Sequence, residues 1–275
     1  MIKLMYITNN PTIAEIADSA GVDRVFIDLE VVGKAERQGG MDTVQSHHSI
    51  SDIPIVKQKL RNSELLVRSN PIYNDSKNEI NKIVTSGADI IMLPFFKTAE
   101  EVTHFVDYVG GRARTMLLFE TKESVDCIDE ILAIDGIDEY YIGLNDLHLS
   151  YGLDFMFQLL ADGTVDNIVT KFKATGKPYG FGGIAKLGGG LLPAEHVIAE
   201  HYRLGSTIGI LSRSFCNCDK VSDKNIILSL FDDGVSEIRT LEYNLANQSG
   251  EFFEENHKFV INAVNDIVRI IRTKK

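Results

Sequence analysis

The sequence predicts an α/β protein with the fold of a (β/α)₈ TIM barrel, followed by a C-terminal helical extension. Short apolar or β-branched segments alternate with amphipathic segments in eight units over about the first 215 residues. Strands joined by crossover helices run parallel, and eight such units fit a closed barrel. Polar side chains recur near the carboxyl ends of the predicted strands, where such barrels carry their sites. A doubly wound open sheet is the alternative.

The predicted strands are apolar segments that end next to polar residues or glycine. They cover residues 3–8, 24–30, 65–70, 89–95, 115–121, 139–144, 178–184 and 207–212. Near their carboxyl ends lie Glu30, Arg68, Glu120, Asp146 and Ser212. Because parallel strands bring these ends to one face, we expect that face to collect the reactive groups.

The helices between the strands have recognisable starts and ends. Residues 12–15, 76–79 and 98–101 each fit a capping box, in which a hydroxyl and a carboxylate satisfy each other's backbone donors. Gly21, Gly87 and Gly136 stand at helix ends, and an Asp follows each of them two residues later. This recurrence predicts one repeated supersecondary unit.

After Phe215 the alternation stops. Residues 223–247 and 251–273 have the pattern of helices with no strand between them, so we divide the chain into a TIM-barrel catalytic domain, residues 1–215, and a C-terminal helical extension, residues 216–275. The last helix carries an apolar stripe made of Val260, Ile261, Val264, Ile267, Val268 and Ile271. This stripe packs either on its own barrel or on a neighbouring subunit. We expect a homo-oligomer.

The composition narrows the class of protein. With 275 residues, of which 44% are hydrophobic, the chain can bury one large core. A net charge of −11 opposes attraction to nucleic acid and to anionic membranes. No apolar run approaches the roughly 18 residues of a spanning helix, and the N-terminus lacks a signal-peptide layout, so we expect a cytoplasmic protein. The three cysteines match neither a disulfide framework nor a zinc pattern.

Two carboxylates are candidate metal ligands. Glu120 and Asp146 follow adjacent predicted strands, so we expect them to lie within a few ångströms of each other. Like charges that close require a cation or a shared proton. Two protein ligands with water or substrate in the other positions are typical of Mg²⁺, and Mn²⁺ or Co²⁺ also accept oxygen ligands. The alternative is a pair of capping or salt-bridged acids.

Arg68 and Pro94 also end apolar strands. The Arg68 guanidinium either pairs with Glu30 or Glu120 as scaffold, or binds a substrate carboxylate or phosphate. Pro94 fits a rigid wall of a site as well as a plain strand stop. Residues 180–185 loosely match a dinucleotide-binding fingerprint, but they follow the seventh strand rather than the first. There we expect close approach of substrate to the backbone.

The histidines are candidate acids or bases, although a loop histidine is more often solvated or structural. His47 and His48 lie in the long loop after the second predicted strand, which opens onto the reactive face. His148 follows Asp146 by two residues.

Six motifs occur in an order that carries a family resemblance. They are VFIDLE, LLVRSNP, GADIIMLP, LLFET, IDEILAIDGIDEYYIGLNDL and the following Gly152. Over roughly residues 20–215 the chain resembles the HpcH/HpaI aldolase and citrate lyase β-subunit family. The resemblance implies a phosphoenolpyruvate/pyruvate-type barrel carrying a divalent-metal lyase that makes or breaks a carbon–carbon bond beside a 2-keto acid.

Site roles follow from this resemblance motif by motif. Glu120 and Asp146 match the family's metal ligands, and Arg68 matches the residue that binds the carboxylate of the keto acid. The metal would stabilise a pyruvate enolate as a Lewis acid. Backbone amides of Gly143, Leu144 and Asn145, together with Pro94, complete the expected substrate-binding set.

The sequence departs from the family at the acid–base dyad. Pyruvate aldolases of this family carry a His directly after the DLE-type motif and an acid before a later glycine turn, where this chain has Val31 and Thr85. The loop instead offers Lys34 and Arg37, which are similar to the citrate-lyase side of the family and would bind an anionic second substrate.

The general base is therefore sought among Glu30, His47, His48 and a metal-bound water. We expect a metal-dependent aldehyde-lyase of the class II pyruvate-aldolase type that acts on a 4-hydroxy-2-oxo acid. The alternatives are a thioester lyase similar to citrate lyase or malyl-CoA lyase, and a noncatalytic barrel that binds a keto acid.

Overall fold

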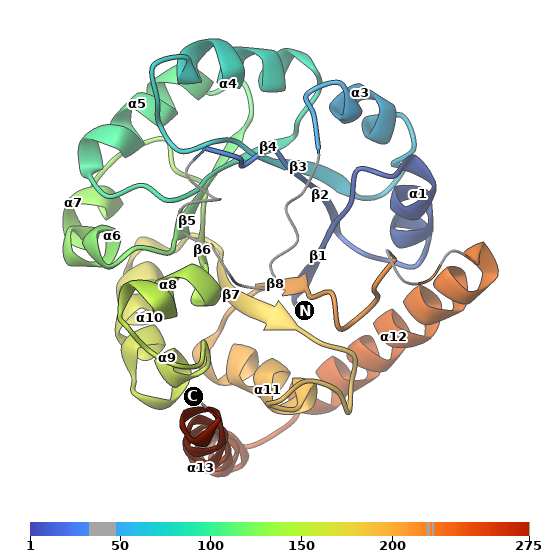
Figure 1. The fold of residues 1–275 in the computed structure, drawn as a ribbon, viewed down its shortest axis with the longest axis vertical. Coiled ribbons are helices and arrows are strands. Elements are labelled where there is room, and N and C mark those ends of the chain that lie inside the picture. The colour runs from blue at the N-terminus through green and yellow to red at the C-terminus, as the bar shows by residue number, and fades with distance from the viewer. Residues whose placement is uncertain (33–47, 219–220, 222, 275) are drawn as a thin grey trace.

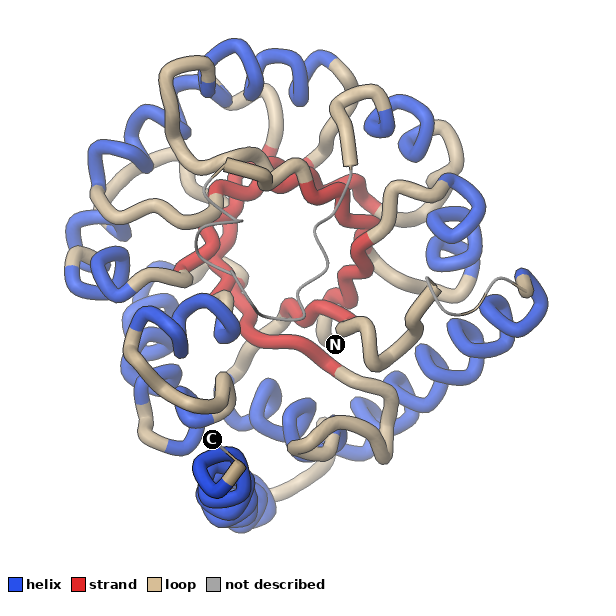
Figure 2. The backbone as a smooth tube through the Cα atoms, in the orientation of Figure 1, coloured by secondary structure: helices blue, strands red, loops and turns tan. Residues whose placement is uncertain are grey.

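The computed structural model describes residues 1–32, 48–218, 221 and 223–274. Eight parallel strands close into a barrel in chain order, β1 to β8, and the predicted fold class is confirmed (Figures 1 and 2). The strands are β1 (Lys3–Ile7), β2 (Arg24–Asp28), β3 (Glu64–Arg68), β4 (Ile90–Leu93), β5 (Arg114–Phe119), β6 (Glu139–Ile142), β7 (Tyr179–Ile184) and β8 (Ile208–Leu211). Each predicted strand overlaps one of these.

The helices form a ring around the barrel, as Figure 1 shows. They are α1 (Pro11–Ser19), α3 (Asp52–Lys57), α4 (Ser76–Thr85), α5 (Ala99–Val109), α6 (Lys122–Asp126), α7 (Ile128–Leu132), α8 (Leu144–Ser150), α9 (Gln158–Ala161), α10 (Thr164–Thr175), α11 (Ala194–Leu204), α12 (Lys224–Leu245) and α13 (Gly250–Thr273). None of the helices in the described ranges is long and apolar enough to cross a membrane.

One of the three predicted capping boxes is present. Thr98 and Glu101 cap α5 reciprocally, with side-chain to backbone distances of 3.2 and 3.0 Å. The box at residues 12–15 is wrong because Pro11 takes the first helical position, and the Asn10 side chain accepts from the amides of residues 12 and 13. The box at residues 76–79 is wrong because the Glu79 carboxylate reaches Asn70 instead of the helix N-cap.

The glycine turns form a repeated unit, as predicted. Gly21, Gly87 and Gly136 have φ values of +89°, +103° and +84°. Two residues after each glycine, just before the next strand, an Asp side chain accepts a backbone N–H from the previous strand of the barrel. The pairs are Asp23 with Leu4 at 2.7 Å, Asp89 with Leu65 at 2.6 Å and Asp138 with Thr115 at 2.8 Å. The turn therefore ends a helix and also joins two neighbouring strands.

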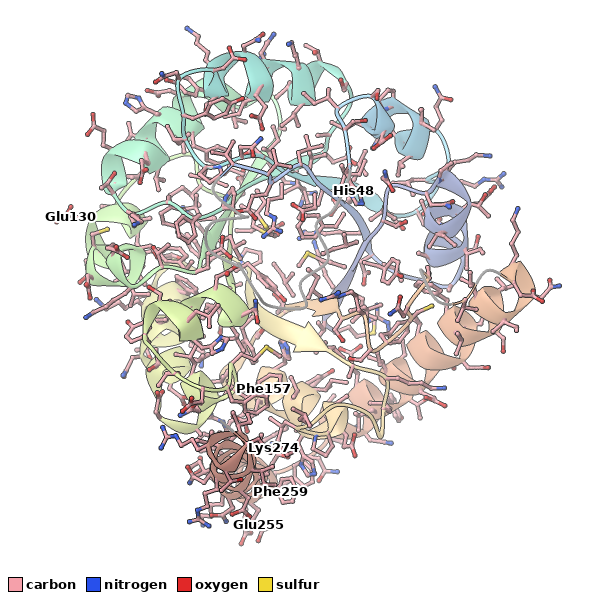
Figure 3. All side chains as sticks on the ribbon, in the orientation of Figure 1. His48, Glu130, Phe157, Glu255, Phe259 and Lys274 are labelled. Atoms are coloured by element: carbon pink, nitrogen blue, oxygen red, sulfur yellow. The ribbon has the colours of Figure 1, made fainter. Side chains whose placement is uncertain are left out.

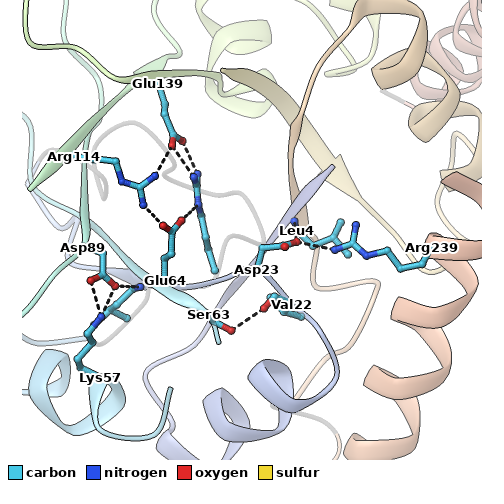
Figure 4. Close-up of polar contacts among 12 residues, drawn as sticks. Leu4, Val22, Asp23, Lys57, Ser63, Glu64, Asp89, Arg114, Glu139 and Arg239 are labelled. Carbon is cyan, nitrogen blue, oxygen red and sulfur yellow. Dashed lines mark hydrogen bonds and ion pairs between the residues drawn. The ribbon is translucent and has the colours of Figure 1, made fainter. Parts of the chain in front are cut away.

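Side chains that alternate along each strand fill the barrel in layers. The middle layer is apolar and contains Met5, Phe26, Leu66, Met92, Met116 and Tyr141. At the amino ends of the strands, Arg24 binds Glu139 with two bonds of 2.6 and 2.7 Å and Glu64 at 3.1 Å. Arg114 contacts the same two glutamates (Figure 4). This charged layer, which we call the lower cluster, closes the barrel at one end and leaves the opposite end for the site.

The C-terminal helices pack on the barrel of their own chain. α12 lies against α1 and α11 and occupies the place of the eighth helix in the ring. The Ile2 amide donates to Glu242 on α12 at 2.5 Å. The boundary that we placed after residue 215 thus separates β8 from the helix that completes its unit, and only α13 lies outside the ring (Figure 1).

The apolar stripe of α13 is covered by the same chain. Val260 and Val264 are fully buried, and α13 contacts α9 and α11. On α11 the buried Glu200 accepts from Asn256 at 3.0 Å, which fixes α13 in place. α13 therefore packs on its own chain, with Ile261, Ile267 and Ile271 of the stripe half-buried, and the homo-oligomer stays a prediction.

Candidate active site

A cavity of about 930 Å³ opens at the carboxyl ends of the strands. Eight residues that the sequence singled out line it, namely Arg68, Glu120, Asp146, His48, Gly143, Leu144, Asn145 and Ser212. Glu30 and Pro94 are not among the described lining residues. Lys34, Arg37 and His47 lie outside the described residues. The structure thus gathers most of the predicted site on one face.

Arg68 is held by two carboxylates. Its Nε and Nη2 donate to Asp28 at 2.9 Å each, and its Nη1 lies 3.2 Å from Glu30. Burial alone lowers the pKa of Arg68, but Asp28 and then Glu30 outweigh it and raise that pKa well above the usual value. Because Asp28 occupies one edge of the guanidinium, the remaining N–H groups of Nη1 and Nη2 are the ones that could bind a ligand.

Asp28 is a site residue that the sequence analysis missed. It is 2% exposed, and its position on β2 is paired in register with Arg68 on β3. The signal was available: an aspartate in the otherwise apolar segment of residues 25–29 is costly to bury unless it has a partner. Period-two alternation places Asp28 on the same inward face as Arg24 and Phe26.

Glu120 is fixed in orientation by its surroundings. The chain leaves β5 at Phe119 with the alternation continuing, so Glu120 faces inward and is 2% exposed. Its Oε1 accepts the amide of Phe95 at 3.0 Å. Phe95 has a φ of +49°, a conformation that costs energy for a residue with a side chain and that recurs at functional sites. The residue after Pro94, rather than Pro94 itself, therefore contacts the site.

Asp146 lies in the first turn of a helix rather than at a strand end. β6 stops at Ile142, and α8 begins at Leu144 with Gly143 as its N-cap and no side-chain cap. The first amides of a helix have no partners within it, so those of residues 144–146 carry partial positive charge beside the cavity. Gly143 lies close to Glu120, since a Cβ there would come within 2.9 Å of its carboxylate oxygen.

The two described histidines that we considered have different roles. His48 borders the cavity inside the ring of helices, and its Nδ1 accepts the amide of Asp28 at 3.0 Å (Figure 3). A neutral His48 therefore carries its proton on Nε2. His148 is buried against the backbone of α8, with Nδ1 3.2 Å from the Leu144 carbonyl. Burial lowers the pKa of His148, so it is a neutral structural residue.

Gly180 of β7 serves the sheet, which corrects our expectation of a substrate contact at this one glycine. A Cβ on Gly180 would lie 2.1 Å from the Ile208 carbonyl oxygen, so the neighbouring strand requires glycine there. The register between β7 and β8 shifts near Gly182, which has a φ of +60°. In this gap the Tyr141 hydroxyl donates to the Gly182 carbonyl and accepts the Ile210 amide. Gly182 and Gly183 still line the cavity.

The positions of the missing dyad do not meet within the chain. Val31 follows the carboxyl end of β2 and is 61% exposed. Thr85 ends α4 and leads into the amino end of β4, at the opposite end of the barrel. Neither contributes a polar group to the cavity.

The donor set suits a hard divalent cation. In the described part of the chain, no group of three or more His, Cys, Asp or Glu is arranged to hold a metal ion. Glu120 and Asp146 offer carboxylate oxygens to one cavity, and Mg²⁺ is commonly bound by one or two carboxylates with water and substrate completing its shell. The residues therefore fit Mg²⁺ better than a metal that requires an all-protein cage.

The chain is similar to curated aldolases at low identity. It is 25% identical over 132 residues to a hydroxypyruvate/pyruvate aldolase of Roseovarius nubinhibens, covering 37% of this chain and about half (51%) of that protein. It is 26% identical over 208 residues to a 4-hydroxy-2-oxovalerate aldolase of Novosphingobium aromaticivorans, covering 62% of this chain and 71% of that protein.

Solved structures share the fold. An HpcH/HpaI aldolase from Desulfitobacterium hafniense matches with a TM-score of 0.59 at 17% identity, covering 77% of this chain and 86% of that one. The citrate synthase SbnG matches with a TM-score of 0.58 at 18% identity, covering 77% and 85%. The family model described as HpcH/HpaI aldolase/citrate lyase matches residues 3–176, more than half of the chain. Together with the motifs and the barrel site, this match shows that the chain belongs to the HpcH/HpaI aldolase/citrate lyase family.

Proposed function

We propose that this protein is a divalent-metal-dependent aldolase that forms or cleaves the bond between a pyruvate unit and an aldehyde, with a 4-hydroxy-2-oxo acid as product or substrate. The observation that carries the proposal is the convergence of Glu120, Asp146 and the Asp28-bound Arg68 on one cavity. The similarity to aldolases of hydroxypyruvate, pyruvate and 4-hydroxy-2-oxovalerate supports this substrate class.

Glu120 and Asp146 would hold the metal. The bound cation would supply Lewis acidity that stabilises negative charge on the keto oxygen. The Phe95 amide keeps the Glu120 carboxylate from rotating, and such outer contacts typically decide how well a ligand is placed. The first-turn amides of α8 border the same cavity, and their partial positive charge would also stabilise negative charge on the keto oxygen.

Arg68 would bind the carboxylate of the keto acid. Asp28 and Glu30 fix the guanidinium plane and keep it charged, and the N–H groups of Nη1 and Nη2 that they leave over would bind the ligand. This arrangement holds the keto acid in one orientation before the aldehyde arrives, which lowers the entropic part of the barrier.

His48 would donate a hydrogen bond to the aldehyde oxygen. Its Nδ1 accepts from the Asp28 backbone, which leaves an N–H on Nε2. Glu30, the other described candidate for the base, pairs with Arg68 beside the cavity. We expect His48→Gln to slow aldol turnover while retaining exchange of the pyruvate methyl protons, and Glu30→Gln to slow both.

The decisive experiment measures pyruvate release from a panel of 4-hydroxy-2-oxo acids after removal of metal with EDTA and re-addition of Mg²⁺ or Mn²⁺. Metal-dependent release, lost in Glu120→Gln and Asp146→Asn, supports the proposal. Cleavage of malyl or citryl thioesters alone would favour the thioester-lyase alternative. Binding of pyruvate or oxalate with neither cleavage nor proton exchange would favour a noncatalytic barrel.

A further inference from the structure

Two cysteines lie side by side in the segment that joins β8 to α12. The Sγ atoms of Cys216 and Cys218 are 3.6 Å apart, which is within hydrogen-bonding distance for sulfur. None of the three cysteines of the chain, all of which lie in the described ranges, forms a disulfide. Cys216 is buried, Cys218 is half-buried, and both line the cavity of the candidate active site. The two thiols therefore contact each other on a wall that a small molecule in the cavity also touches.

Tyr6, near the carboxyl end of β1, holds the pair in place. Its hydroxyl lies 3.1 Å from the carbonyl oxygen of Cys216 and 3.1 Å from Sγ of Cys218. The ring is itself fixed, because it is buried and packs edge-on against Phe231 of α12 with the centroids 4.8 Å apart. β1 also pairs directly with β8, the strand that leads into the two cysteines. Folded elements on both sides therefore set the geometry of the thiol pair.

The hydrogens of this group can be assigned from its partners. A carbonyl oxygen only accepts, so Tyr6 donates its single phenol hydrogen to Cys216. The Cys218 thiol then donates to the phenol oxygen, and the Cys216 thiol donates to Sγ of Cys218. The hydrogen bond with Cys218, and then burial, raise the pKa of Cys216 above its usual value. Cys218 is thus the sulfur that ionises first, because the Cys216 thiol and the rotatable phenol hydrogen can both stabilise its negative charge.

We propose that Cys216 and Cys218 are a modification site at which a hydroperoxide forms a disulfide within the chain. The Cys218 thiolate attacks the O–O bond and becomes a sulfenic acid, while the other oxygen takes up a proton and leaves as an alcohol, or as water when the oxidant is hydrogen peroxide. The Cys216 sulfur then attacks the sulfenic sulfur, and its proton leaves with the hydroxyl as water. The two thiols lose two electrons in total, and these reduce the O–O bond.

The thiol pair needs little movement to react. A disulfide holds its sulfurs at about 2.05 Å, so the two Sγ atoms must approach by roughly 1.5 Å. Only Asn217 separates the cysteines, so the bond closes a small ring, and strained disulfides are the ones that are readily reduced again. The bond also removes the Cys218 hydrogen that Tyr6 accepts, so we expect a reversible change in the cavity wall. None of these steps depends on the proposed aldolase activity.

The test treats the reduced full-length protein with hydrogen peroxide, destroys the excess with catalase and counts thiols in denaturant. The three thiols of the chain should fall to one, and dithiothreitol should restore the other two. Trypsin cleaves after Arg213 and Lys220, so one peptide, residues 214–220, contains both cysteines. After alkylation this peptide should carry no alkyl group and be lighter than the reduced peptide by two hydrogens. Both measurements use the unaltered protein, so they do not depend on the folding of any variant.

Three variants separate the roles of the two sulfurs and of Tyr6. With Cys216→Ser the reaction should stop at the sulfenic acid, which dimedone traps on Cys218, and with Cys218→Ser no adduct should form. We expect Tyr6→Phe to slow disulfide formation about three- to fourfold. A lost hydrogen bond to a charged sulfur lowers the thiolate fraction about tenfold, whereas the accompanying rise in pKa makes the remaining thiolate about threefold more nucleophilic.

Cys127→Ser is the matched control. Cys127 lies between α6 and α7, and it is not among the described residues that line the cavity. This variant should form the disulfide at the rate of the unaltered protein and retain no thiol. Retention of all three thiols after peroxide, a disulfide that joins two chains, or oxidation confined to Cys127 would overturn the inference. A dimedone adduct on Cys216 in the Cys218→Ser variant would contradict the assignment of Cys218 as the attacking sulfur.

Discussion

The two ends of the barrel carry similar charged groups with opposite consequences. At the lower cluster two arginines meet two glutamates, Arg24 is fully buried, and every contact is with another member of the cluster or its strand neighbours. At the upper end Arg68 meets Asp28, Glu30 and, at longer range, Glu120, and a cavity lies beside them. An ion network that is closed on itself is scaffold, whereas one that borders a cavity can bind a ligand with the N–H groups that its own partners leave over.

The same pair of strands produces both ends. The register of β2 and β3 sets Arg24 beside Glu64 at one end and Asp28 beside Arg68 at the other. Alternation then keeps all four inward. The difference lies in what borders them, because the apolar middle layer separates the lower cluster from the cavity at the upper end.

The largest expected effect is on stability at the lower cluster. Arg24→Met should lower the free energy of unfolding by about 3–5 kcal/mol, because it leaves the buried Glu139 without its two-bond partner. Urea unfolding measures this. The double variant Arg24→Met with Glu139→Leu should lose clearly less, and activity per folded molecule should be retained in both. A large loss of activity at unchanged stability would erase the distinction between the two ends.

Replacing a proposed metal ligand should lower activity and leave stability nearly unchanged, the reverse of the effect at the lower cluster. Glu120→Gln should lower kcat/KM for aldol cleavage by about 10²–10³-fold, the effect of removing one strong electrostatic contact from a transition state, while unfolding changes by less than about 1 kcal/mol. Asp107→Asn, on the outer surface of α5, serves as the control. Full activity in Glu120→Gln would remove the metal site from the proposal.

Asp28 should have a smaller effect, because it acts through Arg68. Asp28→Asn keeps the shape but weakens the bonds to Nε and Nη2, so we expect kcat/KM to fall about 10–100-fold, in the range seen when the outer partners of a site are replaced. The change should appear mainly as a higher KM for the keto acid. A pure kcat effect with unchanged KM would instead assign Asp28 a part in proton transfer.

The smallest expected effect is a pH dependence of stability caused by Asp18, which lies at the same end of the barrel as the lower cluster. Asp18 is buried, which raises its pKa, but the amides of Ser63 and Asn62 outweigh this and lower it below the ordinary value. The carboxylate therefore stabilises the fold fully above about pH 4 and loses this contribution as the pH falls through the lowered pKa. Asp18→Asn should cost about 1–2 kcal/mol at neutral pH. The gap between variant and parent should narrow in acid; a gap that stays constant with pH would contradict this.

Period and glycine placement were sufficient to predict the barrel. The strands were predictable because apolar segments recur between capped helices, and the Gly-x-Asp turns appear where expected. Glu120 and Asp146 could be predicted to line one face because parallel strands share an end. The pairing of Asp28 with Arg68 was missed, because it depends on strand register, which one sequence does not display directly.

Other errors have local causes. Asp146 belongs to a helix start, since Gly143 ends the strand earlier than its apolar neighbours suggest. Pro94 drew attention to a turn whose functional group is the next amide, that of Phe95. The segments after β1 and β8 were not foreseen as neighbours, because they lie far apart along the chain and come together only when β1 pairs with β8 to close the barrel.

The hydroxyl of Tyr141 shows how closing the β-barrel limits the chemistry that a residue in its wall can perform. A phenol on the wall of an active site is an attractive proton donor, yet this one already gives its hydrogen to Gly182 and receives one from Ile210. It bridges β7 and β8 at the point where the register between these two strands shifts. An inhibitor designed to hydrogen-bond to this oxygen would have to compete with Gly182 and Ile210. Its useful anchors are therefore Arg68, Glu120 and Asp146.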